Sequence, residues 1–583
     1  MKRLRELMFD RGGLLGLVVL IVYAYLAPTH VVDGDNAEFS TLGTIGGIAH
    51  PSGYPLYLLI LRGLSWVPAA SPAHAAALAT TAIGAAAIVM LHAACRAWGA
   101  KPLAATIACA MFAAAPVVMR LATEAEVFAL NNLIVAAVLW LAAPDGPVQG
   151  AKRTAALGLV AGLGLANHLT CALVAPVGIY GVVCGVREAS GRKLVAIALA
   201  AAGLVIGLLP YLYAFATPET ALSWGKVNDL GDLVHLATRA DYGTSTLVAH
   251  GQQAAITDSL AAMLATISRA WLWAPFALAL GLLGWRIAAP RPGTRDRWAW
   301  GTLALAWFLA GPVLMSQFNA APEGIGLYIV RRFHVLPTLL LALPVAVGFT
   351  EVARWLPERV RAWHRPAAPI AATLGFLAFA GGSLSYVQRV HTGALEAHAR
   401  NMLRALPHDA VVIDAVDAFV FSWGYLQYAL GERQDVTIVA WGMMSLPWYR
   451  HRVAERGCVA DAGPEPAELR LVRHLLATGR PVFIDPGERD VLRALPAYPF
   501  GTLMHVTSEG ALMTVIDAEI ENRSLFAGFD LKYSRPGPDD EWATLVHQRY
   551  AQAWQALGHA LQTIDRERSA AAYQTARDLG PAP

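Results

Sequence analysis

The segment VVDGDNAEFSTLGTIGGIAHPSGYPLY, Val31 to Tyr57, directly follows an apolar run of about 16 residues near 13–28. A helix rises about 1.5 Å per residue, so a run of this length crosses most of a bilayer core. The segment therefore lies at the edge of a membrane. It holds three carboxylates within six residues and then a histidine before a proline-rich turn: Asp33, Asp35, Glu38 and His50.

The composition is that of a polytopic membrane protein. Of the 583 residues, 56% are hydrophobic and 15% are charged, and the mean hydropathy is +0.45. An ordinary soluble domain has about 25% charged residues. The net charge is only +3, and the basic residues form short clusters between apolar runs, so nucleic acid is not expected as a partner. The five cysteines show neither a disulfide framework nor metal-ligand spacing.

Nine segments are long and apolar enough to cross roughly 30 Å of hydrocarbon. They lie near residues 13–28, 72–98, 102–119, 127–143, 193–215, 268–287, 298–316, 334–352 and 367–388. The apolar stretch between Arg153 and Arg187 is interrupted by NHLT, which favours two short helices in a hairpin, so the sequence predicts 11 membrane helices. The basic N-terminus also fits a signal peptide, but no convincing cleavage site follows the apolar run, and we expect an uncleaved first helix.

Lysine and arginine predict the orientation of these helices. They concentrate in alternate loops, which face the cytoplasm by the positive-inside rule. These loops are the N-terminus and the regions 96–101, 152–153, 187–193, 286–297 and 354–365. With the N-terminus cytoplasmic and an odd helix count, everything after about residue 390 lies outside. We expect a multi-pass protein of the cytoplasmic (inner) membrane with an extracytoplasmic C-terminal part.

The chain changes character after about residue 390. Short β-branched runs, in VVIDAV, DVTIVAW, RPVFIDP and GALMTVIDA, are separated by helical stretches and predict a small α/β domain. The last forty residues are helical, and WQALGHAL with YQTARDLGP is typical of one tetratricopeptide-like hairpin, which we interpret as a cap. The predicted units are a transmembrane domain (1–390), an extracytoplasmic α/β domain (391–535) and a helical cap (536–583).

Under this topology, the unusual polar residues fall on the outer side of the membrane. They are Asp33, Asp35, Glu38, His50 and Tyr54 in the first outer loop, Glu124 and Glu126 in the second, Asn167 and His168 at the hairpin tip, and Arg331, Arg332 and His334 in the fifth. Crowded carboxylates raise at least one pKa, which suits a general base. A pre-proline residue such as His50 has an extended backbone.

Structural roles stay open as alternatives for most of these residues. Carboxylates in solvated outer loops need no special reason, which applies to Glu124 and Glu126. His50 also fits a structural histidine, and the pair Asn167-His168 also fits a cap at a helix break. Arg331 and Arg332 also fit a snorkelling pair at the interface.

Four motifs carry a family resemblance: GDNAEF followed by GIAHPSGYPLY, and then TEAEVFALN, GLANHLT and RRFHVLP. Over roughly residues 30–340 they resemble a bacterial and eukaryotic membrane family whose animal member is a protein O-mannosyltransferase acting on plexin-type domains. This chain has Arg331-Arg332-Phe333 where the family is expected to have Glu-Arg-Phe. Of the two arginines, only Arg332 therefore matches the family's arginine. Downstream, the family's acidic cluster is thinned to Asp414 and Asp417, which puts a catalytic role for that region in doubt.

The resemblance implies a C-type glycosyltransferase architecture, an α-helical polytopic membrane enzyme that uses a sugar on a polyprenyl phosphate. In that mechanism Asp35 is the general base for an acceptor hydroxyl, and Glu38 hydrogen-bonds to Asp35 or to the acceptor. His50 hydrogen-bonds to the sugar or the phosphate, and Arg332 neutralises the departing phosphate. One displacement on a β-linked donor gives an α linkage. The substrate-binding set is Asp33, His50, Tyr54, Glu124, Glu126, Asn167, His168, Arg332 and His334.

Several alternatives remain at this stage. A divalent metal held by Asp35, Glu38 and Glu126 is open, because hard cations prefer oxygen ligands, but no cofactor is firmly predicted. The expected partners are a polyprenyl-phosphate-linked sugar, membrane lipids and an extracytoplasmic protein, lipid or glycan acceptor. Mannose follows only from the named relative. The alternative function is a transporter or flippase, which would place its ionisable residues near the bilayer midplane and show paired repeats.

Overall fold

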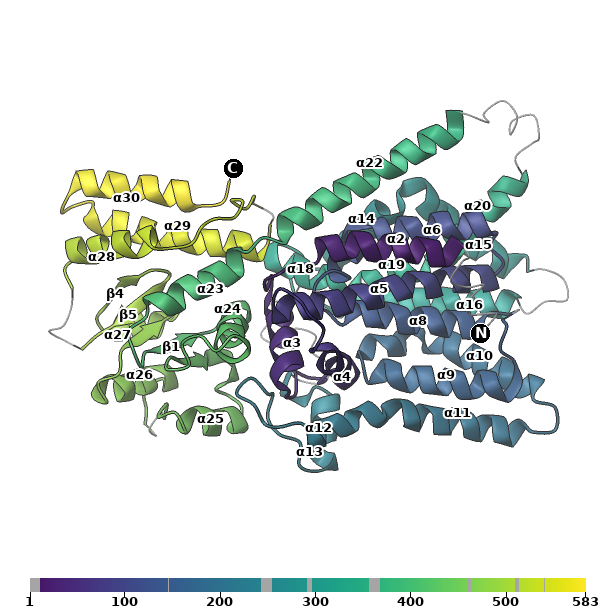
Figure 1. The fold of residues 1–583 in the computed structure, drawn as a ribbon, viewed down its shortest axis with the longest axis horizontal. Coiled ribbons are helices and arrows are strands. Elements are labelled where there is room, and N and C mark those ends of the chain that lie inside the picture. The colour runs from purple at the N-terminus through teal and green to yellow at the C-terminus, as the bar shows by residue number, and fades with distance from the viewer. Residues whose placement is uncertain are drawn as a thin grey trace.

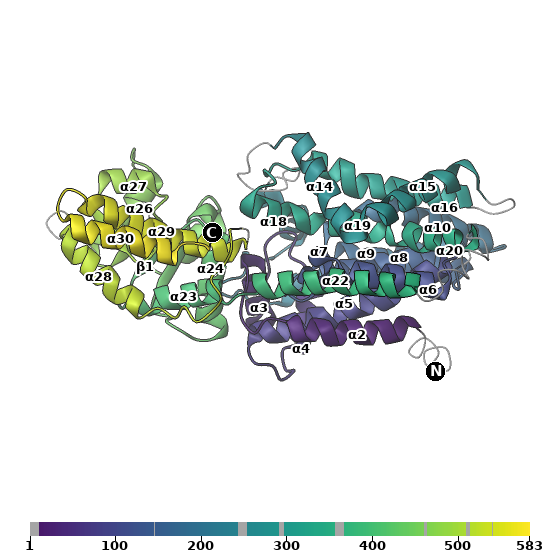
Figure 2. The same cartoon turned by 90° about the horizontal axis from the view of Figure 1, so that it is seen from above.

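The computed structural model describes residues 11–144, 146–242, 254–290, 296–355, 367–459, 463–508, 513–538 and 540–582. The molecule is elongated, with a bundle of long helices at one end and a smaller part, in which helices surround a sheet, at the other (Figure 1). The view from above shows the same two parts joined end to end (Figure 2). The chain passes from the bundle to the smaller part after α22 (Ala367–Val390).

The bundle is built from residues 11–390. Its α-helices are α2 (Arg11–Leu26), α3 (Gly34–Ile45), α4 (Pro55–Leu64), α5 (Pro72–Ala97), α6 (Pro102–Ala114), α7 (Pro116–Leu121), α8 (Phe128–Ala142), α9 (Gly150–Leu165), α10 (Ala175–Glu188), α11 (Lys193–Leu208), α12 (Tyr213–Ala216), α13 (Leu230–Ala237), α14 (Ile256–Trp271), α15 (Trp273–Ala288), α16 (Asp296–Phe308), α17 (Leu314–Ser316), α18 (Gly324–Phe333), α19 (Val335–Leu340), α20 (Ala342–Trp355) and α22. Short 3-10 or π turns are η1 (Leu169–Val174), η2 (Leu209–Leu212), η3 (Ala240–Tyr242) and η4 (Leu309–Val313).

Among the described residues, six helical stretches are long and apolar enough to cross a membrane, or seven if the bent pair α14 and α15 counts as one span. The six are 72–97, 169–188, 193–216, 296–316, 324–355 and 370–405. Helices α2, α6 and α8 are apolar but shorter than this length. The prediction of a helical, mostly polytopic fold is confirmed, and the count of 11 membrane helices stays a prediction.

The predicted span near 268–287 differs from the structure. Residues 268–271 end α14, and α15 begins at Trp273 after a bend of 104°. Leu272, at the bend, has a φ of +60°, which no helix tolerates. Hydropathy carries no signal for such a backbone break, because Trp271, Leu272 and Trp273 at the bend are all apolar. The predicted hairpin between Arg153 and Arg187 is present as α9, η1 and α10, with Asn167 and His168 at its tip.

Glycines let α9 and α11 pack with their backbones in contact. A Cβ on Gly158 would lie 2.0 Å from the carbonyl oxygen of Ala200, and a Cβ on Gly207 would lie 2.3 Å from that of Leu159. Any larger residue at these positions would separate the two helices. This close contact fixes the hairpin against α11 and so fixes the position of its tip.

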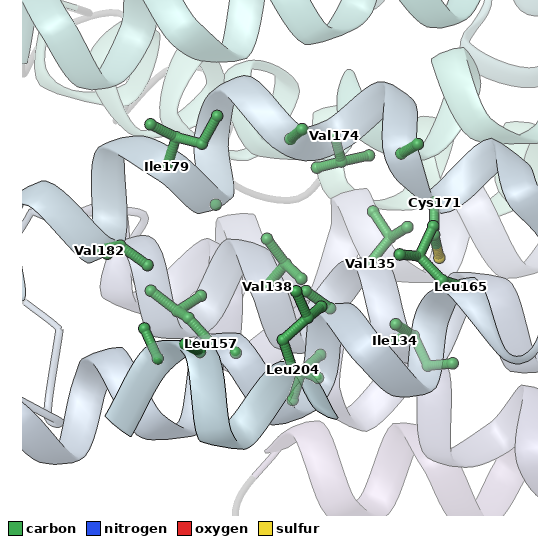
Figure 3. Close-up of a pocket in the computed structure, with 18 of the residues that line it drawn as sticks. Ile134, Val135, Val138, Leu157, Leu165, Cys171, Val174, Ile179, Val182 and Leu204 are labelled. Carbon is green, nitrogen blue, oxygen red and sulfur yellow. The ribbon is translucent and has the colours of Figure 1, made fainter. Parts of the chain in front are cut away.

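An apolar cavity of about 490 Å³ lies between α8, α9, α10 and α11. The side chains around it are hydrocarbon, apart from the sulfur of Cys171 (Figure 3). Such a lining offers nothing for acid–base chemistry, so the reactive groups must lie elsewhere.

The smaller part contains a five-stranded sheet in the order β2-β1-β3-β5-β4. Its strands are β1 (Val411–Asp414), β2 (Thr437–Ala440), β3 (Val482–Ile484), β4 (Ala497–Phe500) and β5 (Leu503–Val506). The first three are parallel, and β5 and β4 continue the sheet antiparallel. The surrounding helices are α23 (Ala394–Ala405), α24 (Asp417–Gly424), α25 (Pro447–Ala454), α26 (Ala467–Ala477), α27 (Arg489–Ala494) and α28 (Val515–Ala527), with η5 (Tyr425–Ala429) and η6 (Trp441–Met443).

The sheet confirms the predicted mixture of strands and helices, with one correction. The run GALMTVIDA does not supply a strand in its described part, because Val515 begins helix α28, which Thr514 caps through its side chain. Its residues 510–512 lie outside the described ranges. The N-cap at Thr514 outweighs the β-branched residues that follow it.

The last described residues form a pair of antiparallel helices, α29 (Trp542–Leu561) and α30 (Arg566–Leu579), as the repeat-like pattern predicted. Gly558 permits the close contact, since its Cβ would lie 3.2 Å from the ring of Tyr573. Figure 1 places this hairpin along the edge of the smaller part, with the start of α29 directed at the bundle.

The two parts meet at the beginning of α3. A Cβ on Gly34 would lie 3.1 Å from the Cα of Ala418, so the first turns of α3 and α24 touch. Helix α3 carries Asp35 and Glu38 and has Asp33 as its N-cap, so these carboxylates lie near the junction between the bundle and the smaller part.

Candidate active site

Asp33 begins helix α3 and fixes its direction. Its side chain accepts a hydrogen bond of 2.6 Å from the backbone N–H of Asn36, which is an N-cap. The other carboxylate oxygen accepts a hydrogen bond from the hydroxyl of Tyr328 on α18. Burial, with the charges of Glu124 and Asp35, raises the pKa of Asp33 to about 7. Asp33 therefore has a structural role that the sequence did not reveal.

Arg332 joins two carboxylates that are far apart in the sequence. Its Nη1 donates to Oδ2 of Asp35 and, at 2.9 Å, to Oε1 of Glu126. The guanidinium carbon also lies 5.1 Å from the centre of the Tyr328 ring. The structure thus brings together Asp35, Glu126 and Arg332, three residues from the candidate set.

Asp35 differs from its neighbours in exposure and in charge. Its side chain is 28% exposed, whereas Glu126 is almost fully buried. Burial would raise the pKa of Asp35, but Arg332 and His50 outweigh burial and hold the pKa below its usual value. Burial raises the pKa of Glu126 to about 8. The raised pKa values expected from crowding therefore belong to Asp33 and Glu126, and Asp35 is the accessible, ionised carboxylate.

Glu38, His50 and Tyr54 form a hydrogen-bonded chain. The buried Glu38 carboxylate accepts from the backbone N–H of His50 at 2.9 Å and pairs with its Nδ1 at 2.5 Å. His50 Nε2 lies 3.1 Å from the hydroxyl of Tyr54. Burial would lower the pKa of His50, but Glu38 outweighs burial and raises it to about 9. At neutral pH the imidazolium is the favoured form.

Asn167 and His168 form the tip of the hairpin beside this chain. His168 caps η1, since its Nδ1 accepts from the backbone N–H of Thr170 at 3.2 Å, and its ring stacks on Tyr54 with the ring centres 5.8 Å apart. Burial and the charge of Arg239 lower the pKa of His168 to about 3, so it is neutral. Asn167 donates to the backbone carbonyl of Val127 at 3.3 Å, while its buried Oδ1 has no partner among the described residues.

Glu124 belongs to a neighbouring cluster. It accepts from Arg120 Nε at 2.7 Å and pairs with His391 at 3.0 Å. Burial would raise its pKa, but Arg120 and His391 lower it to about 2. The guanidinium of Arg120 lies 4.5 Å from the centre of the Tyr328 ring, the same ring that Arg332 approaches.

His334 lies apart from the carboxylates. Its Nδ1 contacts the hydroxyl of Thr266 on α14 at 3.0 Å, and its Nε2 is buried without a partner among the described residues. Thr266 lines the cavity described next, so His334 supports a wall of that cavity instead of facing Asp35.

A cavity of about 270 Å³ lies beside Arg332, between α7, α14, α18 and α22. Four arginines line it together with apolar and aromatic side chains: Arg120, Arg269, Arg331, Arg332, Pro116, Val117, Leu121, Tyr328 and Tyr386. Glu541, at the start of α29, completes the wall. Guanidinium groups beside hydrocarbon suit a ligand with a phosphate and an apolar chain.

Sequence reasoning missed Tyr328, Arg120 and Glu541. Tyr328 precedes Arg332 by four residues on α18, so the two share one helix face, and that spacing was a usable signal. Arg120 precedes Glu124 by the same interval. No local pattern marks Glu541, because its contact with Arg120 spans 421 residues.

The open metal alternative gains no support from the geometry. Among the described residues, no group of three or more His, Cys, Asp or Glu side chains has the arrangement of a metal site. The guanidinium of Arg332 occupies the space between Asp35 and Glu126 that a cation would need.

The bundle and the attached sheet share their fold with a membrane protein whose crystal structure is known. The crystal structure of ArnT from Cupriavidus metallidurans bound to undecaprenyl phosphate matches 86% of this chain and 98% of that chain, with a TM-score of 0.50 and 14% identity. At this identity the match shows the fold alone.

The sequence comparisons are more specific. Residues 35–190 match the family described as the Protein O-mannosyl-transferase TMEM260 N-terminal domain, which confirms the resemblance read from the motifs. The mouse Protein O-mannosyl-transferase TMEM260 is 25% identical over 457 residues, which are 75% of this chain and 63% of the relative. Its namesake from Dictyostelium discoideum is 22% identical over 480 residues, 75% of this chain and 58% of the relative. The chain thus spans about three fifths of the length of these relatives.

Proposed function

We propose that this protein transfers a sugar from a polyprenyl-phosphate donor to a hydroxyl group of an extracytoplasmic acceptor. The observation that carries the proposal is the contact between Arg332 and Asp35 beside an arginine-lined cavity. In the proposal, Asp35 is the carboxylate base, and the adjacent Arg332 is the cation that binds the phosphate. The match of residues 35–190 and the ArnT-like fold support the same reaction class.

In this mechanism, Asp35 accepts the proton of the acceptor hydroxyl while the acceptor oxygen attacks the anomeric carbon. The bond between that carbon and the phosphate oxygen breaks, and the lipid phosphate leaves with the bonding electrons. Arg332 holds one oxygen of Asp35, and the other faces the acceptor. As negative charge develops on the leaving phosphate, Arg332 and the other cavity arginines stabilise it. One displacement inverts the anomeric carbon, so a β-linked donor gives an α linkage.

Glu38 acts by holding His50 as a cation. The imidazolium and the Tyr54 hydroxyl would bind the sugar or the phosphate, and the unpartnered amide oxygen of Asn167 would accept a sugar hydroxyl. Glu126 holds Arg332 in place, and Asp33 holds Tyr328 in place. Glu124 and His168 support them, and His334 supports the cavity wall. Mannose is the first sugar to test, because the relatives are named for it.

The proposed location is the cytoplasmic (inner) membrane, with the N-terminus cytoplasmic. Units 1–390, 391–535 and 536–583 are then a transmembrane glycosyltransferase domain, an extracytoplasmic α/β domain and a helical cap. In this orientation the donor's tail stays in the bilayer while its sugar meets a secreted acceptor at the outer edge.

The first experiment compares the purified wild-type protein with an Asp35→Asn variant. Both are incubated with radiolabelled polyprenyl-phosphate sugars, mannose first, and an extract of secreted and membrane acceptors. Loss of the base should lower transfer at least about a hundredfold while donor binding is retained. Asp258→Asn, which removes an exposed carboxylate of α14, is the matched control and should transfer normally.

Two results would contradict the proposal. If the wild-type protein transfers no label from any donor, it is not this enzyme, and transport of the lipid-linked sugar becomes the function to test. If Asp35→Asn transfers as fast as the wild type, Asp35 is not the base.

A further inference from the structure

The start of α29, more than 400 residues from the first outer segment, reaches into the candidate site. Glu541 accepts a hydrogen bond from Nη1 of Arg120, and both side chains are more than nine-tenths buried. The adjacent Asp540 accepts from Arg389 Nε at 2.7 Å and is also buried. Two consecutive carboxylates therefore attach the C-terminal hairpin to the outer ends of α7 and α22.

Arg120 connects Glu541 to the groups around Asp35. Its guanidinium packs on the Tyr328 ring at 4.5 Å, and Arg332 packs on the same ring at 5.1 Å. The Tyr328 hydroxyl donates to Asp33, and Arg332 donates to Asp35. A continuous set of contacts thus runs from Glu541 through Arg120 and Tyr328 to Arg332 and Asp35.

The charges explain why a carboxylate is needed at the end of this set. Two guanidinium groups on one buried ring repel each other, because like charges are poorly screened away from water. Each guanidinium therefore needs a carboxylate partner. Arg332 has Asp35 and Glu126, and Arg120 has Glu124 and Glu541. Glu124 also pairs with His391, so Glu541 is the partner that Arg120 does not share with that histidine.

We propose that Glu541 is a positioning residue of the active site, which holds Arg120 on Tyr328 and thereby keeps Arg332 in place on Asp35. The inference rests on the proposed function. It gives the C-terminal hairpin a role in the chemistry: the hairpin completes the wall of the arginine-lined cavity in which the donor's phosphate is bound.

The charge on Asp35 provides a readout that a purely structural role of Glu541 would not change. Arg332 and His50 act on Asp35 to lower its pKa, burial opposes them, and the nearby His168 is neutral. Asp33, Glu126 and Asp417 also interact electrostatically with it. If Arg332 is displaced while the other groups stay, the pKa of Asp35 rises, and the acidic limb of the pH dependence of kcat/KM moves to higher pH.

The test compares Glu541→Gln with Glu519→Gln in the full-length protein, using the transfer assay across pH. Glu519 is a matched control, because it is fully buried, pairs with Arg523 and Arg568, and lies in the same C-terminal third. For Glu541→Gln we expect a kcat loss of roughly ten- to a hundredfold and an acidic limb shifted upward by about half a pH unit or more. For Glu519→Gln we expect the acidic limb to stay at the pH of the wild type, even if the variant is less stable.

Glu541→Asp keeps the charge on a shorter side chain and should shift the acidic limb by an intermediate amount. This variant replaces Glu541→Gln in the test if Glu541→Gln folds poorly. The inference is overturned if the acidic limb of both Glu541 variants matches the wild type, or if Glu519→Gln shifts it equally. Failure of the proposed function looks different, since the wild-type protein itself would then transfer no sugar and Glu541 would lose its assigned role.

Discussion

Asp35 is the one carboxylate of its group that is both exposed and held ionised. Asp33 and Glu126 are buried, with pKa values raised to about 7 and about 8, while Arg332 keeps the pKa of Asp35 low. Burial and one arginine thus give the carboxylates of one cluster different pKa values, and Asp35 is the accessible carboxylate that is held ionised. The sequence shows the crowding but not which carboxylates Arg332 will pair with, because Arg332 lies on α18, 297 residues from Asp35 and 206 residues from Glu126.

The ion pair between His50 and Glu38 should make the free energy of unfolding depend on pH. The pKa of His50 is raised from 6.5 to about 9. The stabilisation is therefore complete below about pH 6.5 and is lost as the pH rises through 9. Thermal unfolding of wild type and His50→Gln should differ by on the order of 1 kcal/mol or more at pH 6, and the difference should shrink toward pH 10.

His235→Gln is the control for that measurement, because His235 forms an exposed pair with Asp241 that contributes little. A constant difference between wild type and His50→Gln from pH 6 to pH 10 would show that the imidazole is not charged in the folded protein.

At the scale of helices, the hairpin of α9 and α10 shows what sequence patterns can predict. Its existence and its tip at Asn167 follow from the length of the apolar stretch and the polar interruption. The bend at Leu272 does not, since it depends on one φ angle between two apolar helices. The strands β4 and β5 were missed as well, because they are short and Pro499 lies within one of them.

The glycine contact between α9 and α11 leads to a second prediction. Gly158→Ala should destabilise the protein by about 1–3 kcal/mol, because the new Cβ would lie 2.0 Å from the Ala200 carbonyl and force the helices apart. Gly281→Ala in α15 is the matched control, since no atom lies within 4 Å of its added Cβ. Equal melting temperatures of the two variants in the same detergent would exclude a rigid α9–α11 contact.

At the scale of the whole molecule, the sheet-containing part contacts the segments that connect the helices of the bundle near His50. Arg452 on α25 donates to the backbone carbonyls of Ala221 and Ser223, at 3.1 and 2.6 Å. Ser223 and Trp224 then hydrogen-bond the backbone of Ile48, two residues before His50. The segment before His50 is thus braced by a helix about 400 residues later in the chain, and no local sequence pattern could reveal this support.

This bracing predicts that a change on α25 loosens the segment before His50. Arg452→Ala removes both hydrogen bonds and the contact of the guanidinium with Trp448, 5.0 Å from the ring centre. Without them, the amides of Ile48 and Trp224 should exchange with deuterium at least about tenfold faster, since local opening becomes less costly. Arg493→Ala, at an exposed pair with Asp490, should leave both amides unchanged. If Arg452→Ala also leaves them unchanged while folding normally, the bundle holds the segment before His50 without help from Arg452.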